Sequence, residues 1–69
     1  MINRQDIIPF MKKGWVAMDR HHTWVWWEKK PDIRCDYFWS ALQGNYTCLS
    51  DCFNIAPADD WTKSLIKVG

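Results

Sequence analysis

The chain has 69 residues, with nine Lys and Arg against eight Asp and Glu, so its formal net charge is +1 at pH 7. This length fits one small domain, residues 1–69, in which burying enough apolar surface is difficult. The balanced charge argues against nucleic acid as a partner, because a phosphate-binding surface needs clustered Lys and Arg. No apolar run is long enough for a membrane span, and residues 1–14 lack the apolar region of a signal peptide, so we expect a cytoplasmic protein without a membrane partner.

Residues 3–13 are expected to form a short helix that Asn3 caps at its amino end. Pro9 interrupts the pattern because it removes a backbone donor. It therefore either kinks this helix or begins a shorter one over residues 9–13. The residues at helical spacing, which must pack on the rest of the protein, are Ile7, Phe10 and Met11.

From residue 14 onward the apolar period changes to two, which predicts two strands, 14–19 and 23–29, joined by the polar segment Arg20-His21-His22. The expected pairing places Asp19 opposite Trp24. In that register Trp15, Trp24 and Trp26 share one face of the hairpin, and the other face is apolar too. One face then takes the helix or the remaining core, and the other needs a second layer or stays partly open.

The second half of the chain predicts shorter elements. Pro31 ends the second strand. Residues 35–41 alternate again, a turn follows at residues 43–45, and residues 46–49 return as an antiparallel strand. Residues 50–60 are expected to cross irregularly, anchored by Phe53 and Ile55, before a final short strand or helical turn in residues 61–69. The fold class is therefore α+β: a short N-terminal helix with a small, curled, mostly antiparallel sheet of four or five strands.

The cysteine pattern indicates neither disulfides nor a metal site. Three cysteines are an odd number, which excludes a complete set of intramolecular disulfides. Cys48 and Cys52 are four residues apart, which is not the spacing of a zinc knuckle, although His21 or His22 could complete a Cys3His site. We expect the cysteines to behave as small apolar residues in a reducing compartment, with no metal and no cofactor.

Catalytic residues are not expected either. Both histidines fall in the predicted hairpin loop, without an oriented nucleophile beside them. Asp59 and Asp60 are adjacent on an irregular segment, so their carboxylates do not face one another. The three glycines are isolated and form no phosphate-binding loop. The sequence therefore predicts a protein that is not an enzyme.

The aromatic surface is the main candidate for function. Six tryptophans in 69 residues must be mostly buried for so small a domain to be stable, yet Trp and Tyr are also enriched at binding hot spots. We predict a protein-protein interaction surface; its residues are Trp15, Trp24 and Trp26, with Arg20, His21 and His22 at the rim. A ligand-binding module that stacks a sugar ring or a single-stranded base on exposed tryptophans is the alternative. Self-association as a homodimer is a third possibility.

The segment GWVAMD followed by WVWWEKKP resembles a loose group of uncharacterised small proteins of phages, prophages and other mobile elements of gut and anaerobic bacteria. The matching residues are Gly14 to Ala17, Asp19, Trp24, Trp26, Glu28, Lys30, Pro31, Asp60 and Trp61. The hairpin loop departs from the group, which tends to have a glycine there, so a loop longer than a tight primed turn is expected. The resemblance implies an intracellular accessory protein that binds a host or phage protein. It implies no particular activity.

Overall fold

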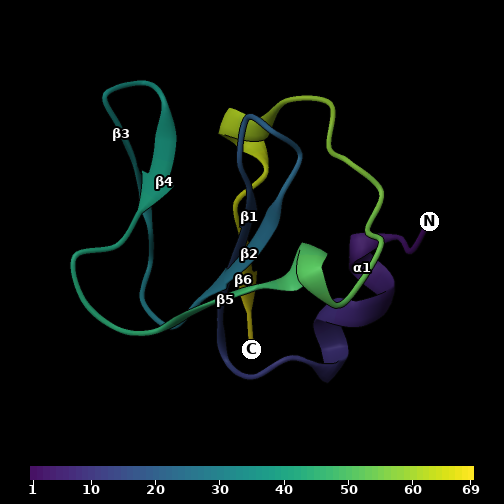
Figure 1. Cartoon of the computed structure of the whole chain (residues 1–69). Coiled ribbons are helices and arrows are strands. Elements are labelled where there is room, and N and C mark those ends of the chain that lie inside the picture. Colours follow the sequence, from purple (N-terminus) through teal and green to yellow (C-terminus); the bar gives the residue numbers. More distant parts are fainter.

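The chain is organised around an antiparallel hairpin of β1 (Gly14–Met18) and β2 (Trp24–Trp27), in a computed structural model that describes residues 1–69. Strand β6 (Ile66–Val68) pairs with the outer edge of β1, and β5 (Tyr46–Cys48) pairs with the outer edge of β2. The result is a four-stranded antiparallel sheet in the order β5-β2-β1-β6 (Figure 1). The predicted α+β class, with one short N-terminal helix and a mostly antiparallel sheet, is confirmed.

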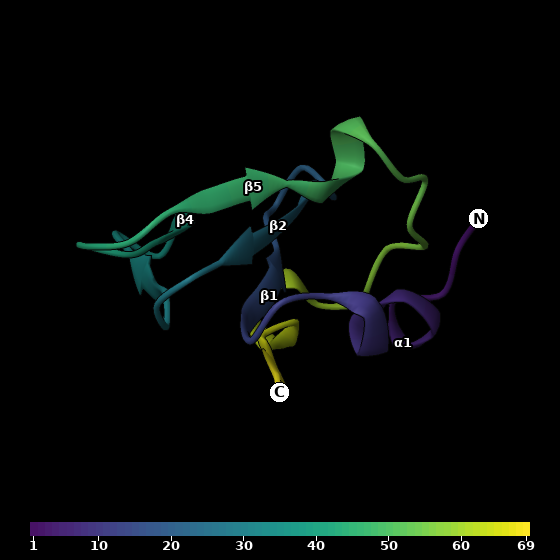
Figure 2. The ribbon, with the colours of Figure 1, turned by 90° about the horizontal axis from the view of Figure 1, so that it is seen from below.

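Different parts of the chain cover the two faces of this sheet. A second, two-stranded sheet of β3 (Asp32–Arg34) and β4 (Phe38–Ser40) lies on one side. The N-terminal helix α1 (Arg4–Ile7) and the irregular crossing over residues 52–60 lie on the other side, so that the β3–β4 sheet and the helix are at opposite ends of the molecule (Figure 2).

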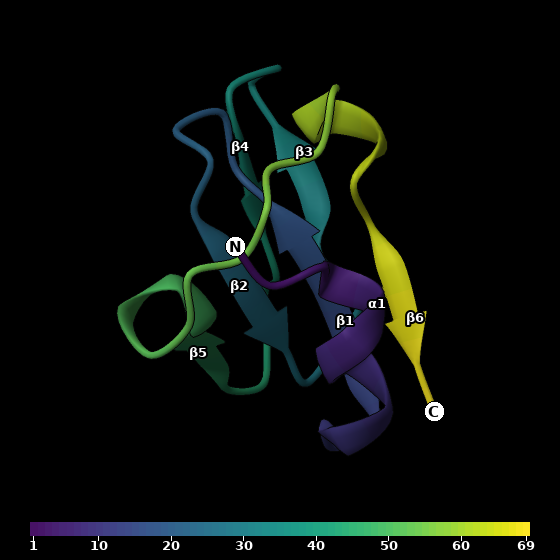
Figure 3. The ribbon, with the colours of Figure 1, turned by 90° about the vertical axis from the view of Figure 1, so that its right-hand side faces the viewer.

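The buried core lies between the four-stranded sheet and the helical side. Val16, Met18 and Trp24 point into it and are almost completely excluded from solvent. The irregular crossing closes this side, since Ile2 and Ile55 form a parallel bridge in which the Ile2 N–H donates to the Asn54 carbonyl at 2.7 Å (Figure 3). Of the two residues predicted to anchor the crossing, Ile55 is buried, whereas Phe53 is 42% exposed and does not anchor it.

The N-terminal helix is shorter than the predicted range 3–13. Asn3 caps it as predicted, its Oδ1 accepting from the Gln5 N–H at 3.0 Å. After one α-helical turn the chain tightens into a 3-10 turn, η1 (Ile8–Phe10). Pro9 lies in the first turn of η1, where a backbone N–H would have no partner within the helix, so its missing N–H costs no hydrogen bond. Pro9 therefore neither begins a helix over residues 9–13 nor sits within a longer one. The backbone is extended at Met11, so the helical segment ends at Phe10 and does not include Lys12 or Lys13.

The register of the central hairpin differs by one residue from the prediction. Met18 pairs with Trp24 and Val16 with Trp26, because the loop contains three residues and not four. The Asp19 N–H donates to the Thr23 carbonyl at 2.9 Å, and His22 takes a φ of +66°, as the last residue of such a three-residue loop usually does.

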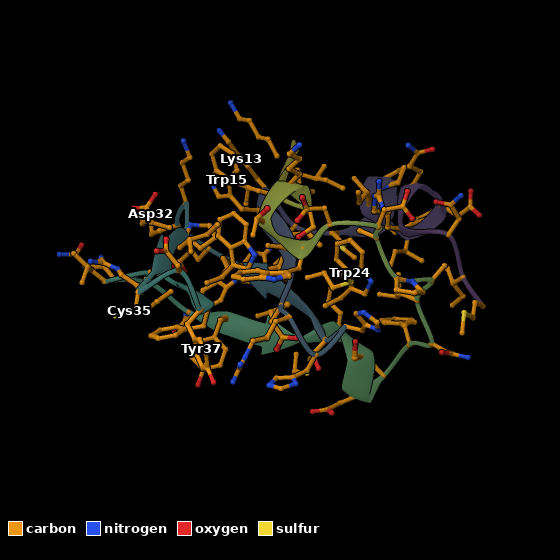
Figure 4. All side chains as sticks on the ribbon, turned by 90° about the horizontal axis from the view of Figure 1, so that it is seen from above. Lys13, Trp15, Trp24, Asp32, Cys35 and Tyr37 are labelled. Atoms are coloured by element: carbon orange, nitrogen blue, oxygen red, sulfur yellow. The ribbon has the colours of Figure 1, made fainter.

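A shift of one residue moves side chains to the opposite face of a strand. Trp24 and Trp26 therefore lie on the core face with Val16, while Trp15 and Trp27 lie on the other face. The prediction that Trp15, Trp24 and Trp26 share one face is wrong. Figure 4 shows Trp15 beside Lys13, apart from Trp24 on the helical side.

The strand predicted over residues 35–41 begins three residues later. Cys35 and Asp36 have φ values of +56° and +54° and form a turn, closed by the Tyr37 N–H donating to the Arg34 carbonyl at 3.0 Å. The sequence analysis ends the second strand at Pro31 and predicts no strand directly after it, so it does not include β3, the partner of β4. In consequence β5 pairs with β2 and not with the preceding strand.

The last segment contains both predicted alternatives, a 3-10 turn η3 (Trp61–Lys63) followed by β6. A further 3-10 turn, η2 (Leu49–Asp51), follows β5. The helical segments have only three or four residues each, and none reaches the length of a membrane span.

Candidate functional site

The predicted contact tryptophans have three different environments. Trp24 is 0% exposed, and its Nε1–H donates to the Ala56 carbonyl at 3.2 Å, so it belongs to the core. Trp26 is half-buried, with its Nε1–H donating to the Lys12 carbonyl at 3.1 Å. Trp15 is also half-buried, on the opposite face, and the ammonium groups of Lys30 and Lys67 lie 5.6 and 5.9 Å from its ring centroid.

The predicted rim residues Arg20, His21 and His22 are exposed at the tip of the central hairpin. The Arg20 guanidinium lies over the ring of Tyr37, 3.3 Å from its centroid, and so links this loop to the β3–β4 turn. The structure therefore does not bring the rim and the three tryptophans into one surface. Two other surfaces, described next, are better formed.

The first is an apolar hollow on the helical side of the protein. It has a volume of about 350 Å³ and is lined entirely by apolar side chains, Ile7, Phe10, Met11, Leu49 and Phe53. Phe10 is 89% exposed and Phe53 is 42% exposed, so both rings stand at its margin. Helical spacing predicted that Phe10 would pack on the core, but the 3-10 turn leaves it in solvent.

A more polar hollow adjoins the apolar hollow and shares Met11 and Leu49 with it. Its other lining residues are Lys12, Trp26, Glu28, Asn45 and Thr47. The two hollows together present an apolar centre with polar and charged groups at one margin. Of the predicted site residues, Trp26 is the one that borders this surface.

The second surface is a cleft on the other face of the sheet, between β2, β5 and β4, which we call the aromatic cleft. Its volume is about 410 Å³. The floor comes from Ala17 and Val25; the remaining lining residues are Asp19, Trp27, Phe38, Trp39, Ser40, Ala41, Gly44 and Tyr46. Sequence reasoning missed this cleft, because it depends on the hairpin register and on the unassigned strand β3.

The two tryptophans of the aromatic cleft differ in their hydrogen bonding. The Trp39 Nε1–H donates to the carbonyls of Met18 and Trp61, at 3.1 and 3.3 Å, and so fixes β4 to the sheet. The buried Nε1–H of Trp27 has no acceptor. The Trp27 ring instead contacts Tyr46, with 5.4 Å between ring centroids.

The metal-ligating side chains are not clustered. No group of three or more His, Cys, Asp or Glu side chains is placed to hold a metal ion, and Cys35, Cys48 and Cys52 are free thiols. The Thr62 hydroxyl and N–H donate to Asp60 Oδ1, at 2.6 and 3.0 Å, and lower the pKa of this exposed carboxyl below its ordinary value. Asp60 is thereby the N-cap of η3, which is a structural role.

Comparison of the chain with protein-family models, with characterised proteins and with solved structures finds no match.

Proposed function

We propose that this protein is a non-enzymatic interaction module that binds a partner protein through the apolar hollow. The observation that carries the proposal is Phe10, a large apolar side chain 89% exposed beside a hollow with only apolar lining. Contiguous apolar surface of this kind, bordered by polar residues, is typical of protein-protein interaction sites.

The local backbone supports a binding role for Phe10. Its turn is held by the Met11 N–H donating to the Ile8 carbonyl at 3.0 Å, while Ile7 and Met11 on either side pack against the core. A ring presented on a fixed turn loses little conformational freedom on binding, which favours affinity. The polar margin at Lys12 and Glu28 matches the usual arrangement of an apolar interface centre with a polar rim.

The partner that fits this surface is a protein that inserts an apolar side chain between Phe10 and Phe53. Burying one Phe-sized side chain contributes about 1.5–3 kcal/mol, so loss of Phe10 should weaken such a complex by roughly tenfold or more. The proposed setting is the cytoplasm, with a host or phage protein as the partner, in line with the mobile-element resemblance.

The test compares capture of proteins from nuclease-treated bacterial lysate by the wild type, Phe10→Asp and Leu42→Asp. Leu42 is a matched control, because it is 86% exposed but lies outside the apolar hollow. Both substitutions alter exposed side chains, so each should change the free energy of unfolding by about 0.5 kcal/mol or less. A stoichiometric partner bound by the wild type and Leu42→Asp but not by Phe10→Asp is the expected result.

A partner that Phe10→Asp retains, or that both variants lose equally, would contradict the assignment of this surface. Light scattering of the purified protein tests whether the hollow is covered by a second copy of the chain. A wild-type dimer that Phe10→Asp converts to a monomer would mean that a second copy of the chain, and not another protein, covers the hollow.

A further inference from the structure

The aromatic cleft has one charged residue in its lining, and this residue is a carboxylate. Asp19 is half-buried, and its Oδ1 accepts from the backbone N–H groups of His21 and Thr23, at 2.8 and 3.0 Å. These bonds fix the carboxylate in one orientation, and its Oδ2 forms no hydrogen bond within the protein. A fixed carboxylate with a free oxygen is a ready acceptor for a cationic donor.

The other end of the cleft is aromatic. Trp27 and Tyr46 are cross-strand neighbours on β2 and β5, and their rings are tilted by 37° to one another. Tyr46 is 69% exposed, so its ring borders open solvent and can adjust to a ligand. A further aromatic ring could take an offset or edge-to-face position against this pair.

The hairpin register sets the distance between the two ends. Asp19 lies opposite Thr23, and Trp27 is four residues further along β2. At about 3.3 Å per residue the two ends are roughly 13 Å apart, which suits an elongated ligand and not a compact ion.

The cations of the protein do not occupy this cleft. Arg20 lies on the ring of Tyr37, and Arg4 lies 5.6 Å from the ring centroid of Trp24 on the core side. Arg34, the cross-strand neighbour of Phe38, lines an adjoining hollow with Lys29 and Lys30, which shares only Ala41 with the cleft. The rings of Trp27 and Tyr46 therefore keep their electron-rich faces free of an internal cation.

We propose that the aromatic cleft binds an arylalkylamine, an elongated organic cation whose ring packs on Trp27 and Tyr46 and whose ammonium group donates to Asp19. Charge complementarity with the single carboxylate selects the amine end, and the aromatic pair selects the ring end. The volume of about 410 Å³ falls within the usual range of roughly 300–1,000 Å³ for small-molecule sites. This site is separate from the apolar hollow, so its failure would leave the proposed protein-binding function untouched.

The experiment uses three probes of similar length, 4-phenylbutylamine, 4-phenyl-1-butanol and 4-phenylbutyrate, which share a phenyl ring and a four-carbon chain and differ in the end group and its charge. Binding is followed by NMR through the indole N–H signal of Trp27, with that of Trp24 on the opposite face as the internal control. We expect the amine to bind at least about tenfold more tightly than the alcohol, the difference typical of a charge-assisted hydrogen bond, and the carboxylate to bind most weakly.

Two variants assign the two ends. Asp19→Asn keeps an oxygen to accept from the His21 and Thr23 N–H groups but removes the charge, so the amine should lose its advantage over the alcohol. Tyr46→Leu, at an exposed position, should weaken amine and alcohol by the same factor.

Equal binding of the amine and the alcohol by the wild-type protein would overturn the proposal, and this comparison stands even if Asp19→Asn fails to fold. Tighter binding of methyl β-glucoside or uridine than of the amine would overturn it in favour of sugar or base stacking. A Trp27 signal that none of the probes moves would overturn the cleft as a ligand site.

Discussion

Ser64 completes the hydrogen bonding of β1 at the point where the partner strand leaves it. Pairing with β6 covers β1 from Gly14 to Val16. Beyond that, the Met18 N–H donates to the Ser64 hydroxyl oxygen at 2.8 Å, and this hydroxyl lies 2.7 Å from the Trp61 carbonyl, to which it can donate. We predict that Ser64→Ala is among the most destabilising small substitutions in the protein.

The magnitude follows from burial. Ser64 is 2% exposed, so water does not replace its hydroxyl unless the structure opens. An unpaired buried N–H costs about 1–3 kcal/mol, and we expect Ser64→Ala to lower the free energy of unfolding by about 2–3 kcal/mol. A domain of this length has a total stability of roughly 3–10 kcal/mol at about 0.05–0.15 kcal/mol per residue, so the loss is a large fraction.

Ser50 provides the matched control on the other edge of the hairpin. Its hydroxyl accepts from the Trp24 N–H at 2.8 Å, at the end of β2 that pairing with β5 does not cover. Ser50 itself is exposed, however, so water can replace its hydroxyl. Ser50→Ala should therefore cost less than about 1 kcal/mol. Urea unfolding followed by tryptophan fluorescence, with the slope unchanged between variants, measures both values. Equal losses for the two variants would refute the argument from burial.

Three further predictions concern the other polar and strained positions. Trp39→Phe should destabilise the protein by about 2 kcal/mol more than Trp27→Phe. The indole N–H that Trp39→Phe removes is hydrogen-bonded, whereas the one that Trp27→Phe removes is buried without an acceptor. Equal unfolding free energies of the two variants would contradict this. His22→Gly should stabilise by about 0.5–1 kcal/mol in urea unfolding, since φ is +66° at this exposed residue; an unchanged midpoint would mean that the loop is not strained. The lowered pKa of Asp60 means that its contribution is present above the unfolded pKa and disappears as the pH falls through the folded pKa. The difference in urea midpoint between the wild type and Asp60→Asn should therefore shrink on acidification, and a constant difference across pH would count against the Thr62 hydrogen bonds as its cause.

The sequence alone predicted features that depend on local chemistry. The Asn3 cap, the two central strands and the position of the loop between them follow from side-chain hydrogen bonding and a change of apolar period. The α+β class follows from the order of these elements. The longer loop also follows from the sequence. A tight two-residue primed turn needs positive φ values at its central positions, and the segment Arg20-His21-His22 contains no glycine to adopt them.

The tertiary structure decided which face each tryptophan occupies. The loop register depends on Asp19, whose side chain accepts from two N–H groups of its own loop and whose own N–H donates to the Thr23 carbonyl, so that it lies opposite Thr23 and not opposite Trp24. That single residue of shift separates Trp15 from Trp24 and moves Trp27 toward the aromatic cleft. Apolar alternation cannot detect such a shift when both faces of a hairpin are apolar, because either register buries a similar area.

Partner choice among short strands was likewise beyond the sequence. β3, β4 and β5 have three residues each, too few for their own pattern to specify a neighbour. The β3–β4 hairpin is positioned by long-range contacts instead, the Trp39 indole on Met18 and the Arg20 guanidinium on Tyr37. The aromatic cleft exists because of these contacts between residues distant in the chain, whereas the helix cap and the strands of the central hairpin were already determined by residues adjacent in sequence.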